Sequence, residues 1–184
     1  MMAEPGPRRG PGPLVRVLGR AVNSAVARFP WSWRLFSGPV RRFFDSVAVG
    51  WDERVRSDSP EYLEPLVAAL DRLEASPGRI LDIGTGTGAA ALELADRYPD
   101  AEVVGIDISA EMVAQAKAKA ADRSGPVRFL VADIASFVDE EGFDLTVRRR
   151  TPGCAFLLVA STATAGTKCQ CNCANHKYRK HHRG

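Results

Sequence analysis

The fold of this chain is decided by residues 79–88, RILDIGTGTG. The first half of the stretch is apolar and predicts a short buried strand, and glycines then occupy every second position: Gly84, Gly86 and Gly88. Because glycine has no Cβ atom, such a turn adopts positive φ without steric cost and lets a ligand approach the backbone closely. The helix predicted behind it directs its first N–H groups to the same place. The stretch predicts a binding site for a polar ligand at the carboxyl end of a strand.

Two classes of ligand fit a glycine turn of this kind. Dinucleotide-binding loops space their glycines as G-x-G-x-x-G, with an acid about 20 residues further on. Here the spacing is G-x-G-x-G, one acid, Asp82, lies inside the strand, and a second, Asp107, lies in the next apolar run, VVGIDIS. This spacing disfavours an NAD-binding oxidoreductase, which is kept as the less favoured alternative.

The runs DIGTGTG and VVGIDIS together resemble the motifs of class I S-adenosylmethionine-dependent methyltransferases, and the resemblance covers residues 43–147. It implies a Rossmann-like α/β fold, with a parallel sheet of strand order 3-2-1-4 and helices on both faces. In that family the loop lies against the methionine part of the cofactor, and the acid after the second strand binds the ribose hydroxyls. The resemblance therefore implies S-adenosylmethionine as cofactor and methyl transfer to a small-molecule acceptor.

The resemblance also assigns roles to individual residues. Asp107 would accept hydrogen bonds from the ribose hydroxyls, Asp133 would accept from the adenine amino group, and Asp82 would orient the loop or meet the ammonium group of the cofactor. From the residues alone, Met112 could equally be a core position and Asp133 a turn or helix cap. No general base stands out, so the catalytic residues are unknown. The expected cofactor-binding residues are Asp82, Gly84, Thr85, Gly86, Gly88, Asp107, Ile108, Met112, Asp133 and Ile134.

Charge divides the 184-residue chain into three segments. Residues 1–42 carry eight arginines and one glutamate, residues 43–147 carry nine basic and 21 acidic side chains, and residues 148–184 carry eight basic and no acidic ones. We expect a basic, partly disordered arm, a partial methyltransferase domain and an atypical tail, in that order. The acidic body disfavours nucleic acid across the site. A body without cysteine, and an N-terminus without a signal-peptide pattern, favour the cytoplasm.

The arm contains a run of helix-spaced apolar residues, 14–29, which Pro30 ends. The following segment, WSWRLFSGPVRRFF, is aromatic and basic. It either packs its apolar stripe on the sheet or a partner subunit, or lies on an anionic membrane or a lipid-like substrate; packing is favoured because moderate amphipathicity is ordinary in globular helices. Phe44 and Trp51 either wall the substrate entrance or lie in the core.

Helices and strands alternate after this arm. Ser59 and Pro60 suit the start of a helix, although Pro65 favours a later start. A short helix or turn is expected at 134–138. Strands separated by helical crossovers imply a parallel sheet. The expected strands are 79–83, 102–106, 127–131 and 143–147, and the expected helices are 87–98 and 110–122, the second capped by Ser109.

The resemblance ends after Val147, where the chain becomes basic and rich in cysteine and histidine. A frameshift or truncation of the family's C-terminal half is the simplest hypothesis, and the activity would then be impaired; the alternative is a noncatalytic cofactor-binding fragment. Residues 154–160, CAFLLVA, either pair antiparallel beside strand 4 or remain loose. No metal is expected, because the tail's possible zinc ligands are spaced differently from those of common structural sites. These residues are Cys169, Cys171, Cys173, His176, His181 and His182.

Overall fold

A five-stranded sheet is the centre of the computed structural model, which describes residues 24, 26, 28–57, 59–74, 76–123, 125–149 and 156–160. The elements in chain order are η1 (Pro30–Ser32), α2 (Trp33–Val47), α3 (Trp51–Val55), α4 (Pro60–Leu70), β1 (Arg79–Ile83), α5 (Ala89–Arg97), β2 (Glu102–Asp107), α6 (Ala110–Ala120), β3 (Val127–Val131), β4 (Leu145–Arg149) and β5 (Phe156–Ala160).

The strand order is β3-β2-β1-β4-β5. The first four strands are parallel, with Asp82 of β1 opposite Gly105 of β2 and Val147 of β4. The predicted order 3-2-1-4 is therefore confirmed. β5 pairs antiparallel with β4, from Leu145 opposite Ala160 to Arg149 opposite Phe156. Of the two possibilities for residues 154–160, the structure has the antiparallel strand.

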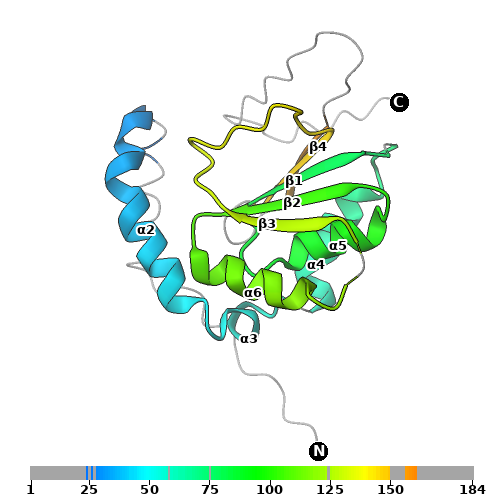
Figure 1. Ribbon diagram of the computed structural model, residues 1–184, viewed down its shortest axis with the longest axis horizontal. Helices are drawn as coiled ribbons and strands as arrows, with labels where there is room; N and C mark the ends of the chain where they lie inside the picture. Colours follow the sequence, from blue (N-terminus) through cyan, green and yellow to red (C-terminus); the bar gives the residue numbers. More distant parts are fainter. Residues whose placement is uncertain are drawn as a thin grey trace, which may run out of the picture.

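The two faces of the sheet are covered differently. Helices α4, α5 and α6 lie against one face, below the sheet in Figure 1, and form the larger core cluster with strands β1 to β4. The opposite face carries a smaller cluster around Leu81, Val104 and Ile106, against which Phe137 and Phe143 of the β3–β4 connection pack. Among the described residues, helices α4–α6 thus share one face, and a connection without regular helix covers the other. Residues 134–136 of that connection form a turn, one of the two expected forms.

Several boundaries differ from the expected ones. β4 starts at Leu145 instead of residue 143, because the Asp144 carboxylate turns back to accept the backbone N–H groups of Gly78 and Arg79. α5 starts at Ala89, since Gly88 is its left-handed N-cap. α4 begins at Pro60 with Ser59 as its N-cap, which confirms the start indicated by these two residues, and it keeps Pro65 inside the helix.

Several expectations fall outside the described residues. These are the predicted disorder of residues 1–13, most of the helix predicted at 14–29, and every cysteine and histidine considered as a zinc ligand. Within the described part of the chain, no cluster of three or more His, Cys, Asp or Glu side chains could hold a metal ion. None of the described helices is both long enough and apolar enough to cross a bilayer.

Candidate cofactor site

The glycine turn behaves as its sequence predicts at two of its three glycines. Gly84 and Gly86 have φ of 71° and 55°, and a Cβ atom placed on either would meet nothing within 4 Å. Both residues line a cavity of about 460 Å³ at the carboxyl ends of the strands. The turn therefore presents bare backbone to this cavity, as a closely approaching ligand requires.

Gly88 has a different role. Its φ is 87°, but a Cβ there would lie 3.0 Å from both Ala116 of α6 and Phe129 of β3, and the residue does not line the cavity. Gly105 of β2 is similar, since a Cβ would lie 2.7 Å from Phe129 and from the Thr85 hydroxyl. These two glycines allow close packing beneath the turn, so the structure brings Gly88 to the core and not to the cavity.

Four of the N–H groups of the turn are already used within the protein. Gly84 and Thr85 donate to the Ile106 carbonyl at 2.9 and 3.0 Å, Gly86 donates to Asp107 Oδ2 at 2.9 Å, and Gly88 donates to the Thr85 carbonyl at 2.9 Å. A loop that cradles phosphate leaves such donors free for the anion. The turn offers close approach without a nest of free donors, which separates it chemically from a pyrophosphate-binding loop.

Asp107 ends β2 and lies beside the turn on the wall of the cavity. Its Oδ2 accepts from Gly86 N and its Oδ1 accepts from Ser109 N, each at 2.9 Å. Burial and the nearby charge of Asp45 raise its pKa, although these backbone hydrogen bonds oppose the shift. Each carboxylate oxygen has a second acceptor site, so both can still accept from a ligand. The side chain is held in one orientation by the backbone of two loops.

Asp82 lies within β1, 2% exposed, beneath the turn. It does not line the cavity. Its Oδ2 and the neighbouring Thr85 Oγ1 are both buried without a hydrogen-bond partner in the described structure. Burial raises the pKa of Asp82 to about 6, against smaller opposing effects of the Thr85 hydroxyl and the Ala91 backbone. Of its two expected roles, this placement favours orienting the loop over direct contact with a ligand.

Asp133, which follows β3, has a partner that the sequence did not reveal. Its Oδ2 accepts from the indole Nε1 of Trp33, 100 residues earlier, at 2.6 Å, and its Oδ1 accepts from Ala135 N at 2.9 Å. Asp133 also lines the cavity, next to Ile134. The carboxylate is therefore both a turn cap and a cavity residue, so the two roles weighed for it are compatible.

The segment that runs from α2 to α3 touches the loop after each of the first three strands. Trp33 reaches Asp133 after β3, and Asp45 accepts from the hydroxyl of Ser109 after β2 at 2.6 Å. Asp52 accepts from Thr87 after β1 and pairs with Lys119 of α6. We call residues 33–57 the strap.

Burial raises the pKa of Asp52, but the hydrogen bonds from Lys119, Ser57 and Thr87 outweigh burial and hold that pKa below its usual value.

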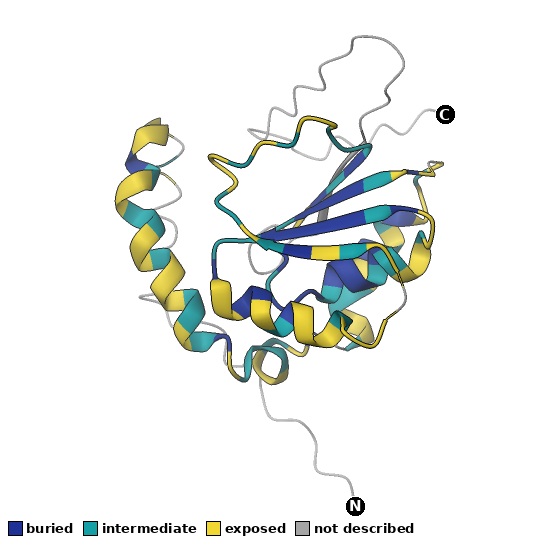
Figure 2. Cartoon of the chain, viewed as in Figure 1, coloured by how far each residue is buried: buried dark blue, intermediate teal, exposed yellow. Residues whose placement is uncertain are grey.

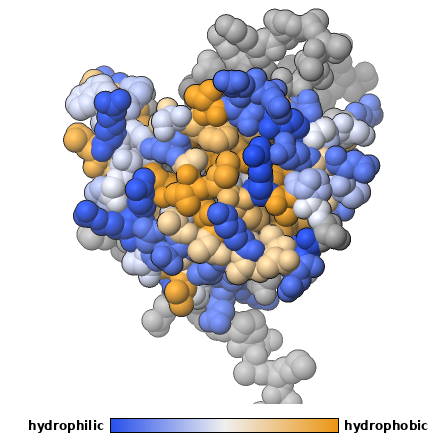
Figure 3. All heavy atoms as spheres, in the orientation of Figure 1, coloured by the Kyte–Doolittle hydropathy of each residue, from blue (hydrophilic) through white to orange (hydrophobic). Residues whose placement is uncertain are grey.

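Aromatic side chains of the strap close one side of the cavity. Trp33, Phe44 and Trp51 line it, and the rings of Phe44 and Trp51 meet edge to face at 5.9 Å. Tyr62 of α4 and Arg148 of β4 also line the cavity. Figure 3 shows hydrophobic side chains between α2 and the sheet, surrounded by hydrophilic ones. The placement of Phe44 and Trp51 agrees with the entrance-wall interpretation.

The structure brings eight of the ten expected cofactor-binding residues to one cavity. Asp82 and Gly88 lie beneath it, while Met112 both lines it and is 1% exposed, so its core and binding roles coincide. Sequence reasoning missed Trp33, Val40, Tyr62 and Ala132. The aromatic run WSWRLF was a visible signal for Trp33, but nothing local connected it to Asp133.

Comparison with known proteins agrees with this geometry. Residues 80–154 match the family described as "Methyltransferase domain". The matched segment spans strands β1 to β4 and the helices between them. Its strand order and glycine turn are those expected for the class I methyltransferase fold.

Individual relatives share part of this methyltransferase domain. A demethylmenaquinone methyltransferase of Thermus thermophilus is 50% identical over 70 residues, covering 38% of this chain and 32% of the relative. A ubiquinone/menaquinone biosynthesis C-methyltransferase of Syntrophotalea carbinolica is 39% identical over 99 residues, covering 53% and 42%. The chain thus spans about a third to two fifths of the length of these relatives.

One solved structure is similar in fold over a larger share of the chain. It is phosphoethanolamine N-methyltransferase 2 of Haemonchus contortus, in complex with phosphomonomethylethanolamine and S-adenosylhomocysteine. The TM-score is 0.50 at 26% sequence identity, and the match covers 60% of this chain and 28% of that one.

Proposed function

We propose that the cavity binds S-adenosylmethionine and that the complete protein transfers its methyl group to a small-molecule acceptor. The observation that carries the proposal is the pairing of the bare turn at Gly84 and Gly86 with Asp107 on the same cavity wall. A bound S-adenosylmethionine supplies an activated methyl group on a sulfonium, so the protein needs no covalent nucleophile of its own.

The charge of the site supports a cationic ligand. Asp107 and Asp133 line the cavity, and Asp45 and Asp52 lie in the strap beside them. A sulfonium and an ammonium group both gain from nearby carboxylates, whereas a pyrophosphate would be repelled by them. The occupied N–H groups of the turn point to the same preference.

The assignments carried by the resemblance fit this cavity as follows. Asp107, held by Gly86 and Ser109, accepts from the ribose hydroxyls with its remaining acceptor sites. Ile108 and Met112 pack against the adenine, and Asp133 accepts from the adenine amino group. The side chains of the strap exclude water from the methyl group and keep it in line with the acceptor.

Titration calorimetry tests the cofactor directly. We expect the purified chain to bind S-adenosylmethionine and S-adenosylhomocysteine, and not NAD. Asp107→Ala removes the ribose acceptor and weakens binding about 100-fold, since a hydrogen bond to a charged group contributes roughly 1.5–3 kcal/mol. Asp100→Ala, an exposed acid in the turn before β2, is the matched control and leaves the affinity unchanged. Binding of NAD alone would overturn the proposal.

A methylation assay then separates a catalyst from a noncatalytic binding module. The chain is incubated with S-adenosylmethionine and a panel of small acceptors, and formation of S-adenosylhomocysteine is measured. Release that requires an acceptor supports methyl transfer. Cofactor binding without turnover on any acceptor would leave only the binding module, the alternative function for this chain.

A further inference from the structure

Helix α2 carries two apolar stripes where a surface helix ordinarily carries one. The inner stripe faces the body of the protein, and three of its members line the cavity: Trp33, Val40 and Phe44. The outer stripe is Leu35, Pro39 and Phe43 of α2, which follow one another at intervals of four and form one ridge, and Trp31 of η1 precedes them. The exposed fractions of Trp31, Leu35 and Phe43 are 68%, 65% and 50%.

The outer ridge lies at the margin of the molecule. In Figure 2 α2 stands at the left edge, exposed along much of its length, and it packs on the body only through its inner side. None of its residues is fully buried. The packing role expected for this segment accounts for the inner stripe and leaves the outer ridge without a function.

The charges beside the ridge have one sign. Arg34, Arg41 and Arg42 are exposed on α2, and none of them makes an ion pair within the described part of the chain. The one acid of α2, Asp45, is held by the Ser109 hydroxyl. The preceding sequence adds five more arginines and a single glutamate: Arg8, Arg9, Arg16, Arg20, Arg28 and Glu4.

We propose that the outer face of α2 docks on an anionic lipid surface. A ridge of Trp, Leu and Phe side chains flanked by unpaired arginines is the composition of a helix that lies in the plane of a membrane interface. The aliphatic stems of the arginines follow the apolar ridge while their guanidinium groups reach lipid phosphates. A convex ridge on one helix offers no groove for a peptide, which favours a lipid surface over a protein partner.

Docking in this way would place the cavity next to the membrane. The inner stripe of the same helix forms part of the cavity wall, so the lipid surface and the cavity lie on opposite sides of one helix. An acceptor with an apolar part could pass between them over a short distance. This consequence rests on the proposed function; lipid docking does not, since it is measured without cofactor.

Co-sedimentation with vesicles tests the proposal on the full chain. We expect binding to vesicles of phosphatidylcholine with phosphatidylglycerol, weak binding to phosphatidylcholine alone, and weakening by salt. Arg34→Glu with Arg42→Glu lowers partitioning at least tenfold, because each basic residue near an anionic surface contributes roughly fivefold. Trp31→Ser with Leu35→Ser lowers partitioning as well. The matched control, Arg72→Glu with Lys117→Glu, changes the net charge equally at exposed positions elsewhere and retains binding.

Three results would overturn the inference. The first is no binding of the wild-type chain to anionic vesicles. The second is an equal loss in the Arg72/Lys117 control, which would make the effect one of net charge alone. The third is a dimer in sedimentation velocity that the Trp31/Leu35 variant abolishes, which would assign the ridge to a second copy. Circular dichroism of each variant confirms that it is folded.

Discussion

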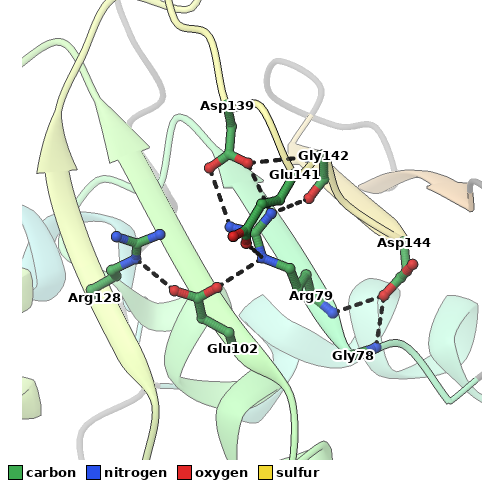
Figure 4. A network of polar contacts seen from close by, with 8 residues as sticks. All are labelled: Gly78, Arg79, Glu102, Arg128, Asp139, Glu141, Gly142 and Asp144. Atoms are coloured by element: carbon green, nitrogen blue, oxygen red, sulfur yellow. Dashed lines mark hydrogen bonds and ion pairs between the residues drawn. The ribbon is translucent and has the colours of Figure 1, made fainter.

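The two ends of the parallel sheet use charged side chains in opposite ways. At the amino end, Arg79 is surrounded by partners: Nε bonds Glu102 at 2.8 Å, the guanidinium bonds Asp139 at 2.8 Å, and it also donates to the Gly142 carbonyl. Figure 4 shows this network, with Arg128 on the far side of Glu102. At the carboxyl end, Asp82 and Asp107 are buried carboxylates without a cationic partner, and the pKa of each is raised.

The amino end of the sheet therefore contributes to stability, and the carboxyl end is suited to binding a ligand. The network at the amino end fastens β1, β2 and the β3–β4 connection to one another, and hydrogen bonds from Arg79 hold the pKa of Asp139 below its usual value. The carboxyl end keeps charge that the protein itself does not neutralise. Such unsatisfied groups cost stability and are retained where a ligand completes them.

The largest effect on stability is expected from Arg79→Met. Methionine keeps the apolar stem but leaves Glu102 and Asp139 without their shared cation. In the ion pair between Arg79 and Asp139, the side chains are 19% and 16% exposed. We expect the midpoint of urea denaturation to fall clearly, because one cation holds both carboxylates through several hydrogen bonds. Affinity for S-adenosylmethionine should stay within about twofold, because the cavity lies at the other end of the strands.

Arg123→Met is the matched control for this variant. It removes an equally short pair, Arg123 with Asp96 at 2.7 Å, whose side chains are 43% and 63% exposed. Exposed ion pairs contribute roughly 0 to 1 kcal/mol to stability, so the midpoint of urea denaturation should change little. Similar losses from both variants would show that the Arg79 network has no special structural role.

At the carboxyl end, Asp82→Asn is expected to stabilise the protein. The unfolded carboxyl group has a pKa near 3.8 and the folded one about 6, so the unfolded state releases its proton first as the pH rises. The wild type therefore loses stability between these values, and the asparagine variant does not. At pH 7.5 the variant should be more stable by about 2 to 3 kcal/mol, with no such gain at pH 3.5.

The same variant sharpens the comparison between the two ends. Asp82 borders Thr85 of the turn, so we expect Asp82→Asn to weaken cofactor binding while it raises stability. Asp100→Asn, at an exposed site, should change neither quantity. A stability gain that is the same at pH 3.5 and 7.5 would contradict the assignment to ionisation of Asp82.

Much of this fold could be predicted because its signals are local. The glycine spacing, the apolar run before it and the Ser109 cap are each read within a few residues, and β1, β3 and the cap, where Ser109 accepts from Met112 N, are confirmed. β4 was displaced by two residues because the cause is distant. Asp144 is held by backbone N–H groups 65 and 66 residues earlier, which no local pattern records.

The candidate site shows the same limit. Most of its residues could be predicted because parallel strands bring their carboxyl ends to one edge of the sheet. The loops after β1, β2 and β3 therefore surround the same cavity. No comparable rule predicts from the sequence where the strap lies. The contact between Trp33 and Asp133 depends on how α2 leans on α6, a tertiary arrangement that the spacing of aromatic residues does not encode.

The smallest effect, and the test of whether the strap belongs to the site, is expected from Trp33→Phe. Phenylalanine keeps an aromatic ring in the cavity wall and removes only the indole N–H that holds Asp133 Oδ2 at 2.6 Å. Asp133 then keeps only the hydrogen bond from Ala135 N, so its carboxylate is oriented less firmly, and affinity for S-adenosylmethionine should fall about tenfold, or 1.4 kcal/mol. Trp31→Phe, two residues away and 68% exposed, is the control and should leave binding unchanged.

A double-mutant cycle decides how Trp33 acts. If it works by orienting Asp133, then Trp33→Phe has little further effect on affinity in an Asp133→Ala background, and the coupling energy is about 1 kcal/mol. If the two losses simply add, the indole contributes packing alone and the strap is a cover over a site complete without it. Calorimetry of the four proteins distinguishes these outcomes. Without the indole, Ala135 N still donates to Oδ1 of Asp133, and only Oδ2 loses its partner, so an orienting role predicts a partial loss of affinity.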